Sequence, residues 1–212
     1  MRRMSLRERK RARTRRALVD AATDLFERNG YHETTIADIA AAAEIGTRTF
    51  FSYFSSKEEL LFPEKDARVD AVVDAIASRG PGDGPAAVLV RALQHIGEDS
   101  DDMVSPLAAL RLRLIRTVPT VRGYALQLQF DAQREIAQHL AEAFPDELDA
   151  VTAAALTGAF IGAITGALQV LLDDPERAEH DPAAMHAAIR RATDVALGPW
   201  LHRQLPGRPR RR

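Results

Sequence analysis

The segment Thr47–Tyr53 carries side chains that can recognise the edges of base pairs. Its order is Thr-Arg-Thr-Phe-Phe-Ser-Tyr, so one Arg and several hydroxyl groups alternate with aromatic rings. An Arg can donate two hydrogen bonds to guanine O6 and N7, and a Thr methyl can contact the methyl of thymine. On a helix, Phe50 points into a core, and the segment fits the major groove of DNA. The outward-facing positions are Thr47, Arg48, Phe51 and Ser52.

Three helices are predicted to form and position this segment. Apolar residues spaced three and four apart indicate a helix over Arg11–Asn29. Thr35 and Asp38 have the spacing of a capping box, which predicts a second helix over Ile36–Ala43. The third helix is expected over Thr47–Phe54. Two short helices joined by a tight turn and braced by another helix make a helix-turn-helix.

The distribution of charge supports a polyanionic partner. Residues 1–16 carry nine Arg or Lys and one acid, Glu8. Residues 1–57 have a net charge of +5, with twelve basic and seven acidic groups, whereas residues 58–205 have a net charge of −10. A basic front end on an acidic body suits a protein that presents one end to nucleic acid. A solubilising arm is the alternative explanation.

Residues 11–62 resemble the N-terminal domain of the TetR family of bacterial repressors. The matching run is ALVDAATDLFERNGYHETTIADIAAAAEIGTRTFFSYFSSKEELL. Its motifs are LF-x-x-x-G-Y, T-T-x-x-x-I-A, T-F-F-x-Y-F and S-K-E-x-L-L. The resemblance covers about a quarter of the chain. It implies an all-α fold, with a three-helix helix-turn-helix DNA-binding domain followed by a larger helical domain for ligand binding and dimerisation.

The resemblance also assigns roles to individual residues. It implies that Thr35 anchors a phosphate, that Tyr53 and Lys57 contact the DNA backbone, and that Arg13 adds a contact from the basic arm. The predicted DNA-binding set is Arg13, Thr35, Gly46, Thr47, Arg48, Thr49, Phe51, Ser52, Tyr53 and Lys57.

One residue in the turn departs from the family pattern. Glu44 stands where many members have Gly, so it either adopts a costly positive φ or the turn has another conformation. Gly46 takes the place of a common Ser and is a weaker but accepted N-cap.

The acidic part of the chain after residue 56 is predicted to be a second, all-helical domain. We expect residues 1–56 to form the basic arm and the helix-turn-helix domain, with the motif itself at about 35–54. The family resemblance implies that residues 57–212 form the ligand-binding and dimerisation domain. Breaks in composition predict helices at about 57–79, 85–98, 103–117, 120–143, 146–173 and 181–204. Pro63 is expected to kink the first of them.

The helix expected around residues 150–172 has two interpretations. This stretch has 23 residues without a charge, and Gly158, Gly162 and Gly166 recur at intervals of four. Small residues at this spacing allow close helix packing. The family resemblance implies a dimer interface there, and packing within the core of one chain is the alternative. The length also permits a membrane span. The many Ala, Gly and Thr residues and the acidic flanks argue against a membrane.

A ligand is expected between the helices of residues 85–172. The candidate ligand-binding residues are apolar except for one Arg: Met103, Leu107, Leu110, Arg111, Leu114, Leu128, Phe130 and Phe160. Arg111, Arg113, Arg116 and Arg122 form a basic cluster that can receive an anionic group. Core packing and a solvated helix face are the plainer explanations. The C-terminal part loosely resembles the subgroup that binds acyl-CoA-like ligands.

These observations predict a repressor that binds a palindromic double-stranded DNA operator as a homodimer. The family resemblance implies that a small hydrophobic or acyl-type ligand releases it, with the helix beginning at Lys57 carrying the movement. The alternatives are a membrane-anchored regulator spanning residues 150–172 and a helical enzyme. No nucleotide-binding or hydrolase motif is present, and the six His lack metal-ligand spacing. We therefore expect no cofactor, no metal and no enzyme activity. We also expect a cytoplasmic location, because the N-terminus lacks a secretory signal.

Overall fold

The computed structural model describes residues 5–99, 105–172 and 182–201 of the 212-residue chain. These residues form helices and turns, with no strand among them. The helices are α1 (Leu6–Asn29), α2 (Ile36–Ala42), α3 (Thr47–Phe50), the 3₁₀ helix η1 (Glu58–Leu61), α4 (Lys65–Ala77), α5 (Pro85–Asp99), α6 (Pro106–Thr117), α7 (Pro119–Ala143), α8 (Ala150–Leu172) and α10 (Pro182–Leu201). The predicted all-α fold class is confirmed.

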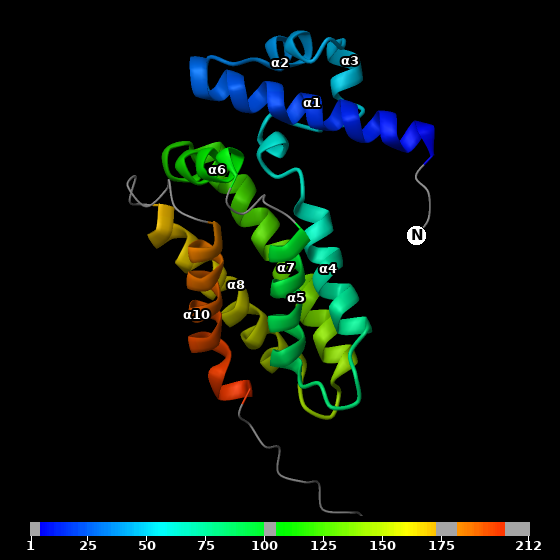
Figure 1. Ribbon diagram of the computed structural model, residues 1–212, viewed down its shortest axis with the longest axis vertical. Coiled ribbons are helices and arrows are strands. Elements are labelled where there is room, and N and C mark those ends of the chain that lie inside the picture. Colours follow the sequence, from blue (N-terminus) through cyan, green and yellow to red (C-terminus); the bar gives the residue numbers. More distant parts are fainter. Residues whose placement is uncertain (1–4, 100–104, 173–181, 202–212) are drawn as a thin grey trace, which may run out of the picture. The chain divides into compact units, whose positions relative to one another are not determined.

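The chain divides into two compact units. The first comprises residues 1–66 and 104–128, and the second comprises residues 67–103 and 129–212. In the first unit, α2 and α3 lie on one side of α1, and α6 lies on the other side (Figure 1). Its core joins Leu18 and Phe26 of α1 to Phe50 of α3 and Leu110 of α6. Burial of these apolar side chains supplies the driving force that such short helices lack on their own.

Helix α1 begins earlier than the apolar pattern predicts. It starts at Leu6 rather than Arg11, because Ser5 and Glu8 form a complete capping box. The Ser5 hydroxyl accepts from the Glu8 N–H at 3.2 Å, and the Glu8 carboxylate accepts from the Ser5 N–H at 2.7 Å. Most of the predicted basic arm is therefore helical, and in Figure 1 the N-terminal end of α1 extends past α3.

The helix predicted to open at Lys57 is interrupted. Glu58–Leu61 forms a short 3₁₀ helix, and α4 begins only at Lys65. Phe62 has φ −130° and ψ 52°, which is outside the helical region. The residue before a proline disfavours the α conformation, and Pro63 has no N–H to donate. Pro63 thus separates two helices rather than kinking one.

The second unit is built from α5, α8, α10, most of α4 and most of α7. Helices α8 and α10 pack along each other, and α10 also contacts α5. The core contains Leu89 of α5, Leu140 of α7, Leu156 of α8 and Ile189 of α10, all at 1% exposure or less. Arg91 joins α5 to the preceding loop through Asp83 and to α4 through the carbonyl of Ala75.

The compact units differ from the predicted domain boundary after residue 56. Leu60 and Leu61, which follow that boundary, are buried in the core of the first unit. Helix α6, at residues 106–117, packs on α1 and η1 in the same unit. The first unit therefore contains the predicted DNA-binding domain together with α6 and the beginning of α7.

Candidate DNA-binding surface

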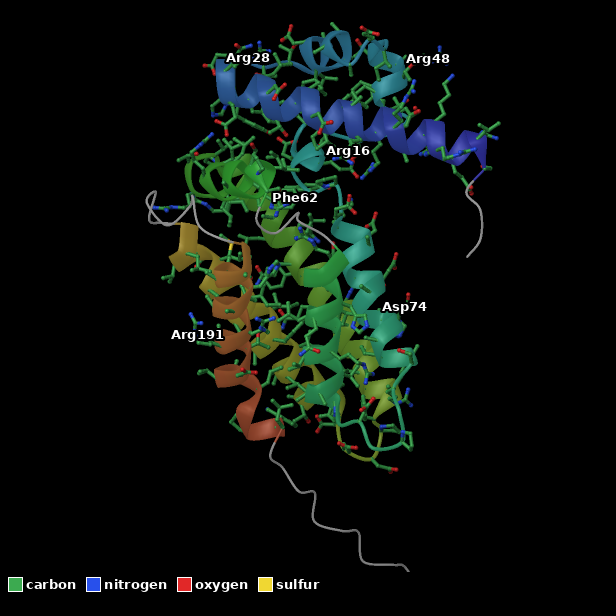
Figure 2. All side chains as sticks on the ribbon, in the orientation of Figure 1. Arg16, Arg28, Arg48, Phe62, Asp74 and Arg191 are labelled. Atoms are coloured by element: carbon green, nitrogen blue, oxygen red, sulfur yellow. The ribbon has the colours of Figure 1, made fainter. Side chains whose placement is uncertain are left out.

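The recognition segment begins at Thr47 and has one buried and one exposed face. Phe50 is completely buried, whereas Phe51 is 56% exposed, and Thr47, Arg48 and Thr49 are also exposed. Arg48 extends from α3 near the outer edge of the unit (Figure 2). Regular helix ends at Phe50, and Phe51–Tyr53 continue as a turn. The predicted orientation of Phe50 and Phe51 is confirmed, but the helix is shorter than predicted.

The turn that precedes α3 has the strained conformation considered for Glu44. The φ of Glu44 is 56°, in the left-handed region that residues with a side chain disfavour. The Ile45 N–H donates to the carbonyl of Ala40 at 2.9 Å, which closes the turn. Gly46 follows with φ −80°, and its carbonyl accepts from the N–H groups of Thr49 and Phe50. Gly46 is thus the N-cap of α3, as predicted, although it offers no side chain.

Thr35 caps α2, and this occupies its hydroxyl group. The Thr35 hydroxyl donates to the Asp38 carboxylate at 2.6 Å, and the Thr35 N–H donates to the same oxygen at 2.9 Å. These hydrogen bonds lower the pKa of Asp38 below its usual value. The predicted capping box is confirmed. The phosphate contact of Thr35 stays a prediction.

Lys57 holds the connection between α1 and α2. Its ammonium donates to the carbonyl of Tyr31 at 2.6 Å and to that of Thr34 at 3.0 Å. It also lies 4.1 Å from the centre of the Tyr31 ring. Burial lowers the pKa of Lys57, against the attraction of Glu58 and Glu33. Two of its three N–H groups thus have partners within the chain, and the predicted contact with the DNA backbone stays a prediction.

Two arginines of α1 contact the end of the recognition segment, and sequence reasoning missed both. Arg11 donates to the carbonyl of Ser52 at 3.2 Å and lies over the half-buried ring of Tyr53. Arg15 donates to the carbonyl of Tyr53 at 3.1 Å and lies 4.3 Å from the centre of the Phe54 ring. The available signal was their spacing, because Arg11, Arg15 and buried Leu18 follow one stripe of the helix.

Arg13 lies elsewhere on α1. It is exposed, and at 3.6 residues per turn it projects about 200° around the helix from Arg11. The structure therefore does not bring Arg13 to the recognition segment.

The predicted ligand-binding residues are not brought together by either unit. Leu107, Leu110, Arg111 and Leu114 are buried in the first unit, where the three leucines belong to the core shared with α1 and η1. Leu128 is half-buried in that unit, and Phe160 is buried in the second. Phe130 is 67% exposed, which contradicts a lining position because an enclosed ligand must be covered. Met103 lies outside the described residues.

The predicted basic cluster has hydrogen-bond partners within the chain. Arg111 donates to the carbonyl of Leu61 at 3.1 Å, and Arg113 forms an ion pair with Glu27 at 2.6 Å. Arg122 donates to the carbonyls of Ile115 and Arg116. These contacts favour the structural explanation of the cluster over an anion site.

The three glycines of α8 have different surroundings. A Cβ added to Gly158 would lie 3.0 Å from the Gln133 side chain of α7, so this glycine faces its own chain. A Cβ at Gly162 or Gly166 would meet nothing within 4 Å. Gly162 and Gly166 therefore remain candidates for a contact with a second copy, whereas Gly158 serves packing within the chain.

The exposed segment at Thr47–Ser52, held on a buried aromatic core by α1 and α2, defines a helix-turn-helix DNA-binding unit. Residues 18–62 match the model of the bacterial regulatory proteins of the tetR family. This part of the chain is therefore similar to the DNA-binding domain of that family.

Relatives and solved structures agree with this assignment. The chain is 35% identical over 120 residues to the HTH-type transcriptional regulator TcmR of Streptomyces glaucescens, a match that covers 56% of the chain and 53% of TcmR. It is 32% identical over 100 residues to the regulator BetI of Agrobacterium fabrum, covering 45% and 46%. The chain thus spans about half the length of these relatives, which are regulators rather than enzymes.

Solved structures share the fold over most of the chain. A TetR-family regulator from Syntrophomonas wolfei has a TM-score of 0.58 at 18% identity and covers 88% of this chain and 96% of its own. FadR of Thermus thermophilus, a TetR-family repressor solved with lauroyl-CoA, has a TM-score of 0.55 at 19% identity and covers 92% and 99%.

Proposed function

We propose that this protein is a DNA-binding transcriptional regulator, acting as a repressor on a palindromic operator. The observation that carries this proposal is the exposed recognition segment, with Arg48 outward and Phe50 buried, in a TetR-family domain. A single unit of this kind contacts only a few base pairs. Two units about 34–36 Å apart contact successive major grooves on one face of the duplex.

A homodimer is part of the proposal, through α8 and α10. These helices pack along each other, yet each leaves apolar side chains in solvent. Val151 and Val170 of α8 are 78% and 66% exposed, and Val195 of α10 is 81% exposed. A second copy placed on this face covers the valines and accounts for the open Gly162 and Gly166.

The same helix α8 meets the length and composition of a membrane span over Ala150–Leu171. A single helix of this kind is weak evidence of a membrane span. In this chain α8 packs on α10 and accepts a hydrogen bond from Gln133 of α7. The relatives are transcriptional regulators, so we favour a dimer interface in the cytoplasm over a membrane anchor.

An acyl-CoA-like ligand is the proposed effector. The support is the fold shared with FadR of Thermus thermophilus, which was solved with lauroyl-CoA. Phe160, one of the predicted lining residues, is buried in the apolar core of the second unit. The test is titration of lauroyl-CoA into the protein–operator complex, in which release of the operator supports the proposal and unchanged binding contradicts it.

The operator itself is found by selecting genomic DNA fragments with the purified protein and sequencing them. We expect a shared palindrome with half-sites about one helical turn or slightly more apart. Arg48→Ala should weaken binding to that site by about tenfold, since a bidentate Arg–base pair contributes about 1–3 kcal/mol.

Arg28→Ala is the matched control. Like the Arg48 variant, it removes one positive charge, but Arg28 lies at the C-terminal end of α1, away from α3 (Figure 2). Arg28 is exposed there and donates to the carbonyl of Asp24. Fragments without a common site, or equal binding by the Arg48 and Arg28 variants, would contradict base recognition by α3.

A further inference from the structure

The segment Leu61–Pro63, which joins η1 to α4, is held by arginines from two different helices. The carbonyl of Leu61 accepts from Arg111 of α6 at 3.1 Å. The carbonyl of Pro63 accepts from Arg15 of α1 at 3.0 Å. Between them, the Phe62 ring lies 5.5 Å from the Tyr124 ring and 5.7 Å from the Arg111 guanidinium (Figure 2 labels Phe62). Both carbonyls lie where the helical hydrogen-bond pattern is broken, so side-chain donors are needed to satisfy them.

Arg15 has a second partner, which links this segment to the recognition segment. Its Nη1 donates to the carbonyl of Tyr53 at 3.1 Å while its Nη2 donates to Pro63. Its guanidinium also lies 4.3 Å from the centre of the buried Phe54 ring. One planar group therefore joins the end of the recognition segment to the start of the chain that leads into α4.

We propose that Arg15 is a positioning residue for DNA recognition, which couples the recognition segment to Leu61–Pro63 and, through Arg111, to α6. The proposal rests on the proposed DNA-binding function. A shift of Leu61–Pro63 pulls on the Pro63 carbonyl, and Arg15 transmits this shift to Tyr53 and to the side chains that precede it. Arg15 acts on DNA only through the placement of that segment.

The chemistry requires an arginine at this position. The guanidinium is planar and presents its N–H groups in a fixed fork, so the two carbonyls are held at a fixed spacing. A lysine keeps the charge but concentrates its donors on a single nitrogen atom. Arg15→Lys therefore tests the geometry of the bridge while leaving the net charge unchanged.

The experiment measures binding of the full chain to the selected operator and to a scrambled duplex across a series of salt concentrations. We expect Arg15→Lys and Arg15→Gln to lower operator affinity by about tenfold, the scale of losing a hydrogen bond to a charged group. Arg15→Lys should leave the scrambled duplex and the salt slope unchanged. A direct phosphate contact would instead weaken both duplexes, and its loss in Arg15→Gln would reduce the slope by about 0.9.

Arg16 supplies the matched control, since it is the next residue, carries the same charge and is exposed. Arg16→Lys and Arg16→Gln should keep the ratio of operator to scrambled binding at its original value. Thermal unfolding of every variant shows whether it is folded at the assay temperature. If the unmodified protein selects no common site, the proposed function fails. If it does select one and Arg15→Lys keeps the full ratio, the positioning role of Arg15 is overturned.

A double-mutant cycle tests the link to α6. Arg111→Lys keeps the buried charge but loses the fork, and it is combined with Arg15→Lys. Coupling predicts that the double variant loses about as much operator selectivity as one single variant. Effects that multiply, with each variant independent of the other, would contradict the path through Leu61–Pro63.

Discussion

At the scale of single residues, backbone carbonyls of the first unit are held by long cationic side chains. Lys57 binds the carbonyls of Tyr31 and Thr34, and Tyr31 in turn donates its hydroxyl to Glu58 at 2.8 Å. Burial, with the negative charge of Glu58, raises the pKa of Tyr31. The connection between α1 and α2 is therefore held by groups at the start of η1.

Glu59 gives a prediction on pH dependence. Its carboxylate accepts from the N–H and the hydroxyl of Ser55, both at 2.6 Å, and pairs with Lys65 at 3.1 Å. Burial opposes ionisation, but these contacts outweigh it and lower the pKa of Glu59. A carboxyl with a lowered pKa stabilises the fold above its unfolded pKa, about 4.3 for Glu, and this is lost as pH falls through the folded pKa.

We therefore expect the free energy of unfolding to fall as the pH drops below about 4.3. Glu59→Gln should flatten part of this decline, as measured by urea unfolding at a series of pH values. Glu64→Gln is the control, because Glu64 is an exposed carboxyl nearby. The same pH profile in Glu59→Gln and the unmodified protein would show that these contacts do not stabilise the fold.

At the scale of elements, replacing Gly162 and Gly166 of α8 tests whether this helix face is free or forms an interface. Glycine inside a helix is about 1 kcal/mol less favourable than alanine. A Cβ at Gly162 or Gly166 meets nothing within 4 Å, so alanine should stabilise an isolated chain. If a second helix approaches closely there, the added methyl group separates the two helices.

We expect the double variant Gly162→Ala, Gly166→Ala to weaken dimerisation by about tenfold or more, measured by sedimentation equilibrium. Gly123→Ala is the control, since Gly123 is a helical glycine of α7 with the same open surroundings. It should leave the dimer unchanged. A dimer as strong with both alanines in α8 would show that the close contact lies elsewhere.

The local patterns in the sequence predict the elements better than the contacts between them. The inward Phe50 and the outward Phe51 follow from helical spacing, and the Thr35 cap follows from the capping-box spacing of Thr35 and Asp38. The start of α1 was also available, because Ser5 and Glu8 have the capping-box spacing. The roles of Arg15 and Arg111 were not available, because their partners are carbonyls 38 to 50 residues away. A basic side chain has the same sequence signature whether it binds phosphate or a carbonyl.

At the scale of the whole molecule, the charge asymmetry supports the proposed binding to DNA. Residues 1–57 have a net charge of +5 and residues 58–205 a net charge of −10. A polyanion attracts the first part and repels the second, so the field favours approach by the basic end. Added salt weakens both effects over a Debye length of about 8 Å at physiological ionic strength.

In the proposed function, a dimer brings two such basic ends to one operator. Val195 is 81% exposed in the single chain, so Val195→Glu removes little buried area from the monomer. In a dimer that covers this valine, the same change buries an unpaired charge. We expect the variant to remain folded and to dissociate about a hundredfold more readily. Because both half-sites must then be occupied by separate monomers, operator affinity should fall with it.

Sedimentation equilibrium measures the loss of dimerisation, and operator titration measures the loss of operator affinity. Ala77→Glu, which adds a charge at an exposed position of α4, is the control and should change neither. A Val195→Glu protein that stays dimeric places the interface away from this part of α10. One that becomes monomeric and still binds the full palindrome with unchanged affinity contradicts the requirement for a dimer, because a monomer has only one recognition segment to place in two grooves.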